Sequence, residues 1–323
     1  MGHKKFEMVL WRGAGHRRPM TVQPTTPTAQ NETARGFVLA LCAYLLWGLL
    51  PFYMKSVGHL PLLEIVAHRI VWSVPIAAAV LIWLGRTADF KMALGTPRML
   101  AMAALTAVLI SVNWGIYVWA IAVDRTVETA LGYYINPLVS VVVGALLLGE
   151  KLDRLQIAAV LMAAVAVTIL TVEGGKLPWV SLGLALSFAA YGFFRKTLPI
   201  GPSQGFLLEV LLLSVPALGY IFWLAATGKG HFGTGDLSDT ALLIGCGPVT
   251  AVPLLLFGFG AKLLRLSTIG IMQYIAPTMV FLIAVFAFNE PFGRIEMVTF
   301  VLIWLALALY SWSMFFSRVR AAN

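Results

Sequence analysis

Ten long apolar stretches restrict what this sequence can fold into. A helix needs about 20 mostly apolar residues to span a membrane, and ten windows of the chain have this character. Hydrophobic residues make up 60% of the chain and charged residues 11%, whereas an ordinary soluble domain has roughly 45–50% and about 25%. We therefore predict an all-α membrane protein with ten transmembrane helices. The windows are residues 36–54, 62–84, 99–123, 126–148, 156–172, 179–198, 205–226, 241–261, 267–288 and 296–315.

Basic residues are distributed unevenly among the predicted loops. The two ends of the chain and every second loop hold 17 Lys and Arg residues, and the other loops hold five. Cytoplasmic loops of membrane proteins carry the excess of Lys and Arg, so we predict that both termini are cytoplasmic. The same bias supports an even number of helices, and it explains the net charge of +9 without a nucleic-acid partner.

The segments outside the windows are short. Residues 1–34 are polar and lack the apolar core of a signal peptide, so we expect a disordered cytoplasmic tail there and a second short tail at residues 316–323. Both cysteines, Cys42 and Cys246, lie in apolar windows, where cysteine packs as a small apolar residue. The sequence indicates no disulfide, metal site or cofactor, and it places the function within the helix bundle.

The chain contains an internal repeat. Residues 132–150 resemble residues 272–290, and the first window resembles the sixth in the same way. These matches divide the bundle into two five-helix halves, residues 36–172 and 179–315. Because five is odd, the second half must be inverted in the membrane relative to the first. Inverted repeats are the architecture of many secondary transporters, and we favour a transporter over a channel.

Two prolines occupy equivalent places in the repeat, Pro137 in the fourth window and Pro277 in the ninth. Each removes a backbone N–H and so frees a carbonyl one turn earlier, at Tyr133 and Gln273 respectively. Paired helix interruptions in two halves indicate a binding site. The alternative is a kink that serves only packing, which is common for proline in membranes.

Three charged or titratable side chains interrupt the second window. Glu64 and His68 are four residues apart and so share one helical face, which would allow such a pair to exchange protons if it faced a cavity. Arg69 projects about 100° away, and we assign it to the substrate. Glu209 in the seventh window is roughly related to Glu64 by the repeat. The alternatives are snorkelling or capping for the two glutamates and a structural ion pair for Arg69.

Further polar and aromatic side chains at membrane depth complete the predicted substrate site. Asn113, beside Trp114, and Asn136, which precedes the paired proline, could hydrogen-bond a substrate or join two helices. Aromatic rings with polar tips suit a cavity for a partly apolar solute, although most membrane aromatics face lipid or the core. The remaining predicted members are Tyr44, Trp47, Tyr134, Tyr191, Gln273 and Tyr274.

Five segments in order resemble the RarD-type branch of the EamA, or drug/metabolite transporter, family. The resemblance covers about residues 36–315. It implies ten helices in two EamA repeats, a bacterial inner-membrane location, and export or import of small metabolites or amphipathic drugs. The segments are GFVLALCAYLLWGLLPFYMK, EIVAHRIVWS, SVNWGIYVWA, LGYYINPLVSVVVGALLLGE and LRLSTIGIMQYIAPTMVFLIAVFAFNE.

These observations predict a secondary active transporter that moves a small amphipathic organic solute by alternating access. Glu64, His68 and Glu209 are the candidates for coupling transport to protons. A passive facilitator of the same fold is the first alternative. A membrane-embedded enzyme or sensor is the second, and the sequence offers no nucleophile, metal cluster or receptor loop for it. The expected partners are a small-molecule substrate and membrane lipid, and a homodimer is left open.

Overall fold

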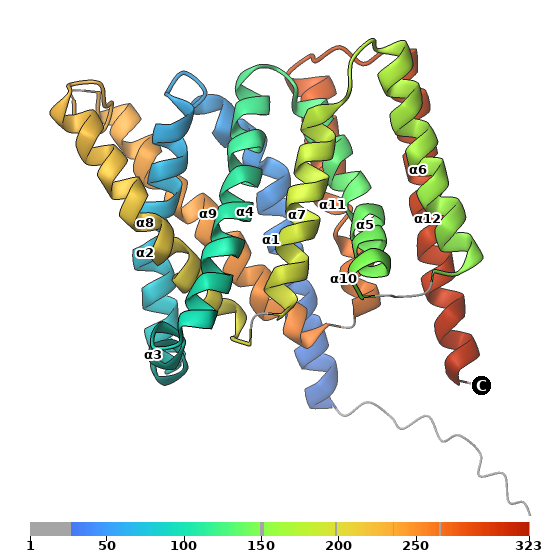
Figure 1. Ribbon diagram of the computed structural model, residues 1–323, viewed down its shortest axis with the longest axis horizontal. Coiled ribbons are helices and arrows are strands. Elements are labelled where there is room, and N and C mark those ends of the chain that lie inside the picture. Colours follow the sequence, from blue (N-terminus) through green and yellow to red (C-terminus); the bar gives the residue numbers. More distant parts are fainter. Residues whose placement is uncertain (1–26, 149–151, 198, 235, 265, 323) are drawn as a thin grey trace, which may run out of the picture.

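The computed structural model describes residues 27–148, 152–197, 199–234, 236–264 and 266–322, and in these ranges every regular element is a helix (Figure 1). The elements are α1 (Pro27–Ser56), α2 (Leu62–Trp83), α3 (Thr87–Leu94), α4 (Pro97–Ala122), α5 (Thr126–Leu148), α6 (Arg154–Glu173), α7 (Trp179–Thr197), α8 (Pro202–Ala226), α9 (Leu237–Leu263), α10 (Leu266–Met272), α11 (Ile275–Leu282), the π-helical η1 (Ile283–Ala287) and α12 (Arg294–Ala322).

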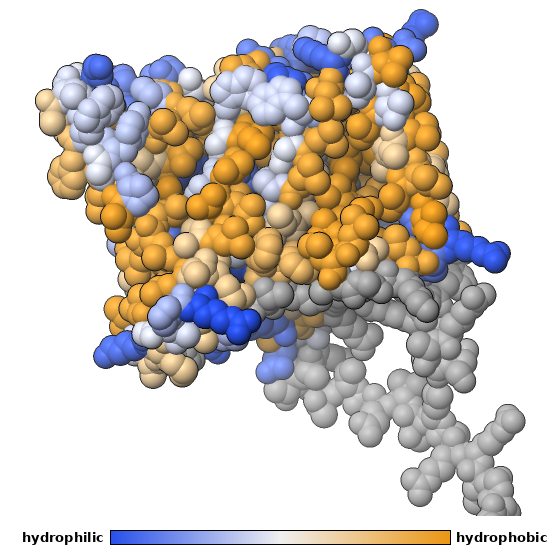
Figure 2. All heavy atoms as spheres, in the orientation of Figure 1, coloured by the Kyte–Doolittle hydropathy of each residue, from blue (hydrophilic) through white to orange (hydrophobic). Residues whose placement is uncertain are grey.

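Within the described ranges, eight helices are long and apolar enough to cross a membrane, namely α1, α2, α4, α5, α6, α8, α9 and α12. Figure 2 shows apolar side chains over the middle of the visible face and polar ones gathered toward its two ends. The sixth predicted window is the 19-residue helix α7, whose last turn holds Arg195 and Lys196. The ninth window, residues 267–288, is divided among α10, α11 and η1.

The two repeated prolines have different consequences. α5 continues through Pro137 as one helix, so the chain is not interrupted there, although Pro137 donates no hydrogen bond to the Tyr133 carbonyl. The prediction for Pro277 agrees better with the structure, because the helix is interrupted at Gln273 and Tyr274, one turn before Pro277. Proline fits the first turn of a helix but cannot donate to the carbonyl four residues earlier, so Pro277 is compatible with a helix that begins at Ile275.

The predicted tails were too long. α1 begins at Pro27, where a proline is suited to the first helical position, so residues 27–34 are helical. The rest of that tail, residues 1–26, lies outside the described residues. α12 likewise continues to Ala322. The start of α1 and the end of α12 lie on the same side of the bundle (Figure 1).

Close helix packing depends on glycine at two positions of α9. A Cβ atom on Gly247 would lie 2.4 Å from the backbone of Trp72 in α2. One on Gly260 would lie 2.8 Å from the backbone nitrogen of Ala40 in α1. Small residues allow membrane helices to approach closely. These contacts hold α1 and α2 against α9 and so fix the position of Arg69 in the bundle.

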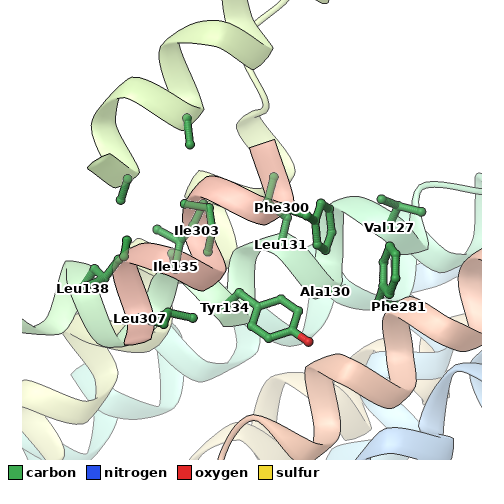
Figure 3. Packing of buried hydrophobic residues seen from close by; sticks show 14 of the residues in the cluster. Val127, Ala130, Leu131, Tyr134, Ile135, Leu138, Phe281, Phe300, Ile303 and Leu307 are labelled. Atoms are coloured by element: carbon green, nitrogen blue, oxygen red, sulfur yellow. The ribbon is translucent and has the colours of Figure 1, made fainter. Parts of the chain in front are cut away.

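An apolar cluster joins α5, α11 and α12. Phe281 and Phe300 pack with their ring centroids 4.7 Å apart, and the ring of Tyr134 meets Phe300 edge to face at 6.0 Å. Figure 3 shows Tyr134 among these residues with Ala130 beside it. This cluster forms an apolar core along one lateral side of the bundle. The charged residues predicted for the site lie outside it.

Candidate functional site

A cavity of about 590 Å³ lies in the middle of the bundle and is lined by residues from α1, α2, α4, α5 and α7–α11. Its size is typical of sites for small organic molecules. Eight of the ten residues predicted to bind substrate line it. They are Tyr44, Trp47, Arg69, Asn113, Trp114, Asn136, Tyr191 and Gln273.

Arg69 is buried in the wall of the cavity and is only 3% exposed. Its Nε donates a hydrogen bond of 3.0 Å to Thr250 Oγ1. The Thr250 hydroxyl itself donates to the Cys246 carbonyl at 2.8 Å, so its lone pairs are directed to the guanidinium. The guanidinium carbon lies 4.9 Å from the centre of the Trp114 ring, a cation–π contact.

No carboxylate in the described part of the chain lies within 4.0 Å of Arg69. The alternative interpretation of Arg69 as a member of a structural ion pair is therefore wrong for these residues. A buried charge is costly unless it is paired. Arg69 is accordingly held in the wall of the cavity by a neutral hydroxyl and an aromatic ring.

Aromatic rings form two walls of the cavity. On one wall, Tyr44 and Trp47 of α1 pack on Phe257 of α9 with centroid distances of 5.5–5.7 Å. On the other, Tyr117 of α4 and Tyr133 of α5 pack at 5.9 Å. Such walls suit a flat or partly apolar solute.

Asn113 lines the cavity, but its amide is used by the protein. Its Nδ2 donates to the Leu184 carbonyl at 3.1 Å and to Ser187 Oγ at 3.0 Å, which joins α4 to α7. Its Oδ1 accepts from the Tyr133 hydroxyl at 3.3 Å. The alternative interpretation of Asn113 as a residue that joins two helices is thus the better one, with the added effect of orienting Tyr133.

Asn136 differs from Asn113. Its Oδ1 is buried and has no hydrogen-bond partner among the described residues, and the residue lines the cavity. Buried polar atoms are generally satisfied. Asn136 therefore keeps an unused acceptor atom next to the cavity, and this atom is itself covered by the protein.

Tyr134 and Tyr274 do not line the cavity as predicted. They stack on each other with centroids 6.3 Å apart, and the Tyr134 hydroxyl shares a 2.6 Å hydrogen bond with Thr278 Oγ1. The physical reason is helical geometry, because adjacent residues point about 100° apart. Tyr133 and Gln273, one position earlier in each repeat, face the cavity instead.

Glu64 and His68 also do not line the cavity. Glu64, 1% exposed, accepts from the backbone nitrogen and from Nδ1 of His231, both at 2.8 Å. His68 Nδ1 accepts from Trp72 Nε1 at 3.0 Å, and its ring lies 4.9 Å from that of Phe232. The two side chains share a face, as expected, but the α8–α9 loop covers that face.

Glu209 is connected to the cavity through its partners. Its Oε1 accepts from Thr106 Oγ1 at 2.8 Å, and its Oε2 accepts from the Tyr191 hydroxyl at 3.3 Å. Arg195 Nε lies 3.4 Å from Oε1. Tyr191 and Arg195 both line the cavity, so Glu209 is the predicted titratable residue closest to its surface.

Several lining residues were missed by sequence reasoning. Tyr133 could have been found, because it occupies the position in the first repeat that Gln273 has in the second. Arg195 and Lys262 were assigned only to loops, whereas they line the cavity where it reaches the ends of α7 and α9. Thr250 has no distinguishing signal in the sequence. In the parts of the chain with described structure, no group of three or more His, Cys, Asp and Glu residues could hold a metal ion.

At the end of the bundle opposite to Arg195 and Lys262, polar contacts join segments that are distant in the sequence. Besides Glu64 and His231, His59 Nε2 lies 2.8 Å from an Asp239 oxygen, and Lys55 pairs with Asp124. The carboxylate of Glu290 accepts from the backbone nitrogens of the first two residues of α5, both at 2.8 Å. Glu290 therefore caps α5 and does not pair with Arg294.

Comparison with known proteins gives consistent results. The model of the EamA-like transporter family matches residues 34–172. A protein named RarD from Streptomyces exfoliatus is 41% identical over 284 residues, which cover 88% of this chain and 90% of that protein. The uncharacterized transporter YojE of Bacillus subtilis (strain 168) is 41% identical over 291 residues, which cover 87% of this chain and 95% of that one.

A solved crystal structure is similar in fold. It is 21% identical in sequence and aligns with a TM-score of 0.56 over 86% of this chain and 96% of its own. The fold is therefore one already seen in a solved protein.

Proposed function

Because the chain belongs to the RarD-type branch of the EamA-like transporter family and is a multi-pass membrane protein, we propose that it is a secondary active transporter. It moves a small amphipathic organic solute across the bacterial inner membrane by alternating access. The observation that carries this proposal is the cavity of about 590 Å³, which lies in mid-bundle and extends to one end of α7 and α9.

Inverted repeats provide two similar conformations, one open to each side. The packing of the helices supports two equivalent halves. α1 packs on α9 as α7 packs on α4, and α10 and α11 pack on α1 as α5 packs on α7. Equivalent residues of the two halves also line the cavity, such as Tyr44 with Tyr191 and Tyr133 with Gln273. On this proposal, α7 and the interrupted α10–η1 segment are the sixth and ninth of ten membrane crossings.

The charge distribution assigns the two sides. Most Lys and Arg residues belong to the side on which α1 begins and α12 ends, so both termini are cytoplasmic by the positive-inside rule. The cavity reaches this side at Arg195 and Lys262. On this proposal the cavity is open to the cytoplasm, as in an inward-facing state, and the polar contacts of Glu64 and Glu290 lie on the outer side.

Proton coupling in this proposal depends on Glu209. Its carboxylate shares hydrogen bonds and an ion pair with Thr106, Tyr191 and Arg195. Protonation would remove the charge that holds Arg195 and would release both cavity-lining partners. Glu64 contacts the α8–α9 loop, so its protonation would act on the outer closure and not on the substrate cavity.

Flux measurements on the full chain in proteoliposomes test this proposal. A panel of labelled amino acids, nucleosides and phenicol drugs is offered under an imposed pH gradient, and at least one solute should accumulate above equilibrium. Glu209→Gln should still equilibrate that solute without accumulating it. Glu296→Gln serves as the control, because the Glu296 carboxylate makes only a local contact at the start of α12.

The outcomes separate the alternatives. Loss of accumulation in Glu64→Gln together with retention in Glu209→Gln would return the coupling role to Glu64. Equilibration without accumulation by the unaltered protein would favour a passive facilitator. This is the second candidate because the described residues that line the cavity include no carboxylate. No flux of any solute would contradict a transport function.

A further inference from the structure

Arg69 is a fixed positive charge in the wall of the cavity, and the described residues give it no anionic partner. Arginine has five N–H donors in a planar fork. One is used by Thr250, and one nitrogen makes only a weak 4.0 Å contact with the sulfur of Met54. Donor capacity and charge thus remain at a residue that lines the cavity.

The other charges on the cavity do not neutralise Arg69. Arg195 is paired with Glu209, and Lys262 adds a second cation toward the cytoplasmic end. Among the described residues that line the cavity there is no Asp or Glu. A ligand with an ammonium group would therefore find no carboxylate among these residues, and Arg69 already lies over the Trp114 ring.

The remainder of the surface is apolar and aromatic. Tyr44, Trp47 and Phe257 form one wall, and Tyr117 and Tyr133 form the other. A small, strongly hydrated inorganic anion would gain little from these rings, whereas an apolar body would replace water against them.

From these features we infer that the transported solute is an organic anion, with an oxyanion such as a carboxylate bound by Arg69 and an aromatic or apolar body between the two aromatic walls. This inference rests on the proposed transport function and names its substrate class. Planar carboxylates match the fork of a guanidinium.

Binding of three probes with one carbon skeleton tests the substrate charge. The anion 3-phenylpropionate, the neutral 3-phenylpropan-1-ol and the cation 3-phenylpropylamine are titrated into the full chain in detergent, and dissociation constants are measured by calorimetry. A charge-assisted hydrogen bond contributes enough for about a 10- to 100-fold preference. The anion should therefore bind at least about 10-fold more tightly than either of the others.

Variants assign this preference to Arg69. Arg69→Gln should reduce the affinity for the anion about 10- to 100-fold and leave that for the alcohol unchanged, whereas Arg69→Lys should retain part of the preference. Arg125→Gln is the matched control, since Arg125 also lies on tryptophan rings, at 5.4–5.5 Å, but is paired with Glu128 and does not line the cavity. Thermal unfolding without ligand shows that each variant is folded.

Equal binding of the three probes, absence of binding, or an anion preference that survives Arg69→Gln would each overturn the inference. These results are independent of flux. A solute that is transported without preference for negative charge would leave the proposed function intact and reject only the substrate class.

Discussion

Replacing Glu290 with alanine should destabilise the contact between the two halves of the bundle. The carboxylate of Glu290 is 6% exposed and accepts hydrogen bonds from the backbone nitrogens of Thr126 and Val127, both at 2.8 Å. These nitrogens lie in the first turn of α5 and have no partner within the helix. Loss of two such bonds at a buried helix N-terminus should cost about 2–4 kcal/mol of unfolding free energy.

The measurement is equilibrium unfolding in mixed micelles titrated with sodium dodecyl sulfate. Glu290→Gln keeps one acceptor oxygen and should lose about half as much, about 1–2 kcal/mol. Glu296→Ala is the control, because Glu296 makes one local bond to the Gly293 nitrogen at 3.0 Å and should cost about 1 kcal/mol or less. If Glu290→Ala costs no more than Glu296→Ala, then the bond between the halves is not a significant source of stability and the reasoning fails.

Three further predictions concern packing and pH. Gly247→Ala would place a Cβ 2.4 Å from the backbone of α2 and should cost about 1–3 kcal/mol in the same unfolding assay; unchanged stability would show that the two helices can separate freely. Tyr134→Phe removes the hydroxyl bonded to Thr278 and should cost about 1 kcal/mol without changing ligand affinity, whereas a weaker affinity would return Tyr134 to the binding site. A hydrogen bond from Ser313 and backbone amides hold the pKa of Asp153 below its usual value, so its contribution is present above the unfolded pKa of about 3.9 and is lost as the pH falls through the lower folded value. Asp153→Asn should reduce this loss of stability in acid, measured by thermal unfolding between about pH 6 and about pH 3, which brackets the pKa range of carboxyl groups. An unchanged dependence of stability on pH would refute the role of Asp153.

Hydrophobic composition and helical period determined a large part of this structure. Both are local properties, because a helix satisfies its own backbone hydrogen bonds and needs only an apolar exterior in a membrane. The sequence therefore located the eight described helices that are long and apolar enough to cross a membrane, and it placed Arg69 on a different face of α2 from Glu64 and His68. It also identified four of the nine aromatic residues that line the cavity in the described part of the chain, namely Tyr44, Trp47, Trp114 and Tyr191.

The choice of helix face in α5 depended on tertiary packing. Tyr133 and Tyr134 are adjacent and chemically identical, and only the positions of α11 and α12 decide that Tyr134 enters the core while Tyr133 enters the cavity. The break at Gln273 has the same origin. Pro137 and Pro277 have the same local effect on hydrogen bonding, yet α5 remains continuous.

Polar partners from distant parts of the chain were also decided by the tertiary structure alone. Glu64 pairs with His231, 167 residues away, and Arg69 is bonded to Thr250, 181 residues away. Spacing along one helix reveals which side chains share a face, but it contains no information on what covers that face. For this reason the ten apolar windows could be predicted from the sequence, whereas the unpaired charge of Arg69 in the central cavity could be recognised only after the helices had been placed around it.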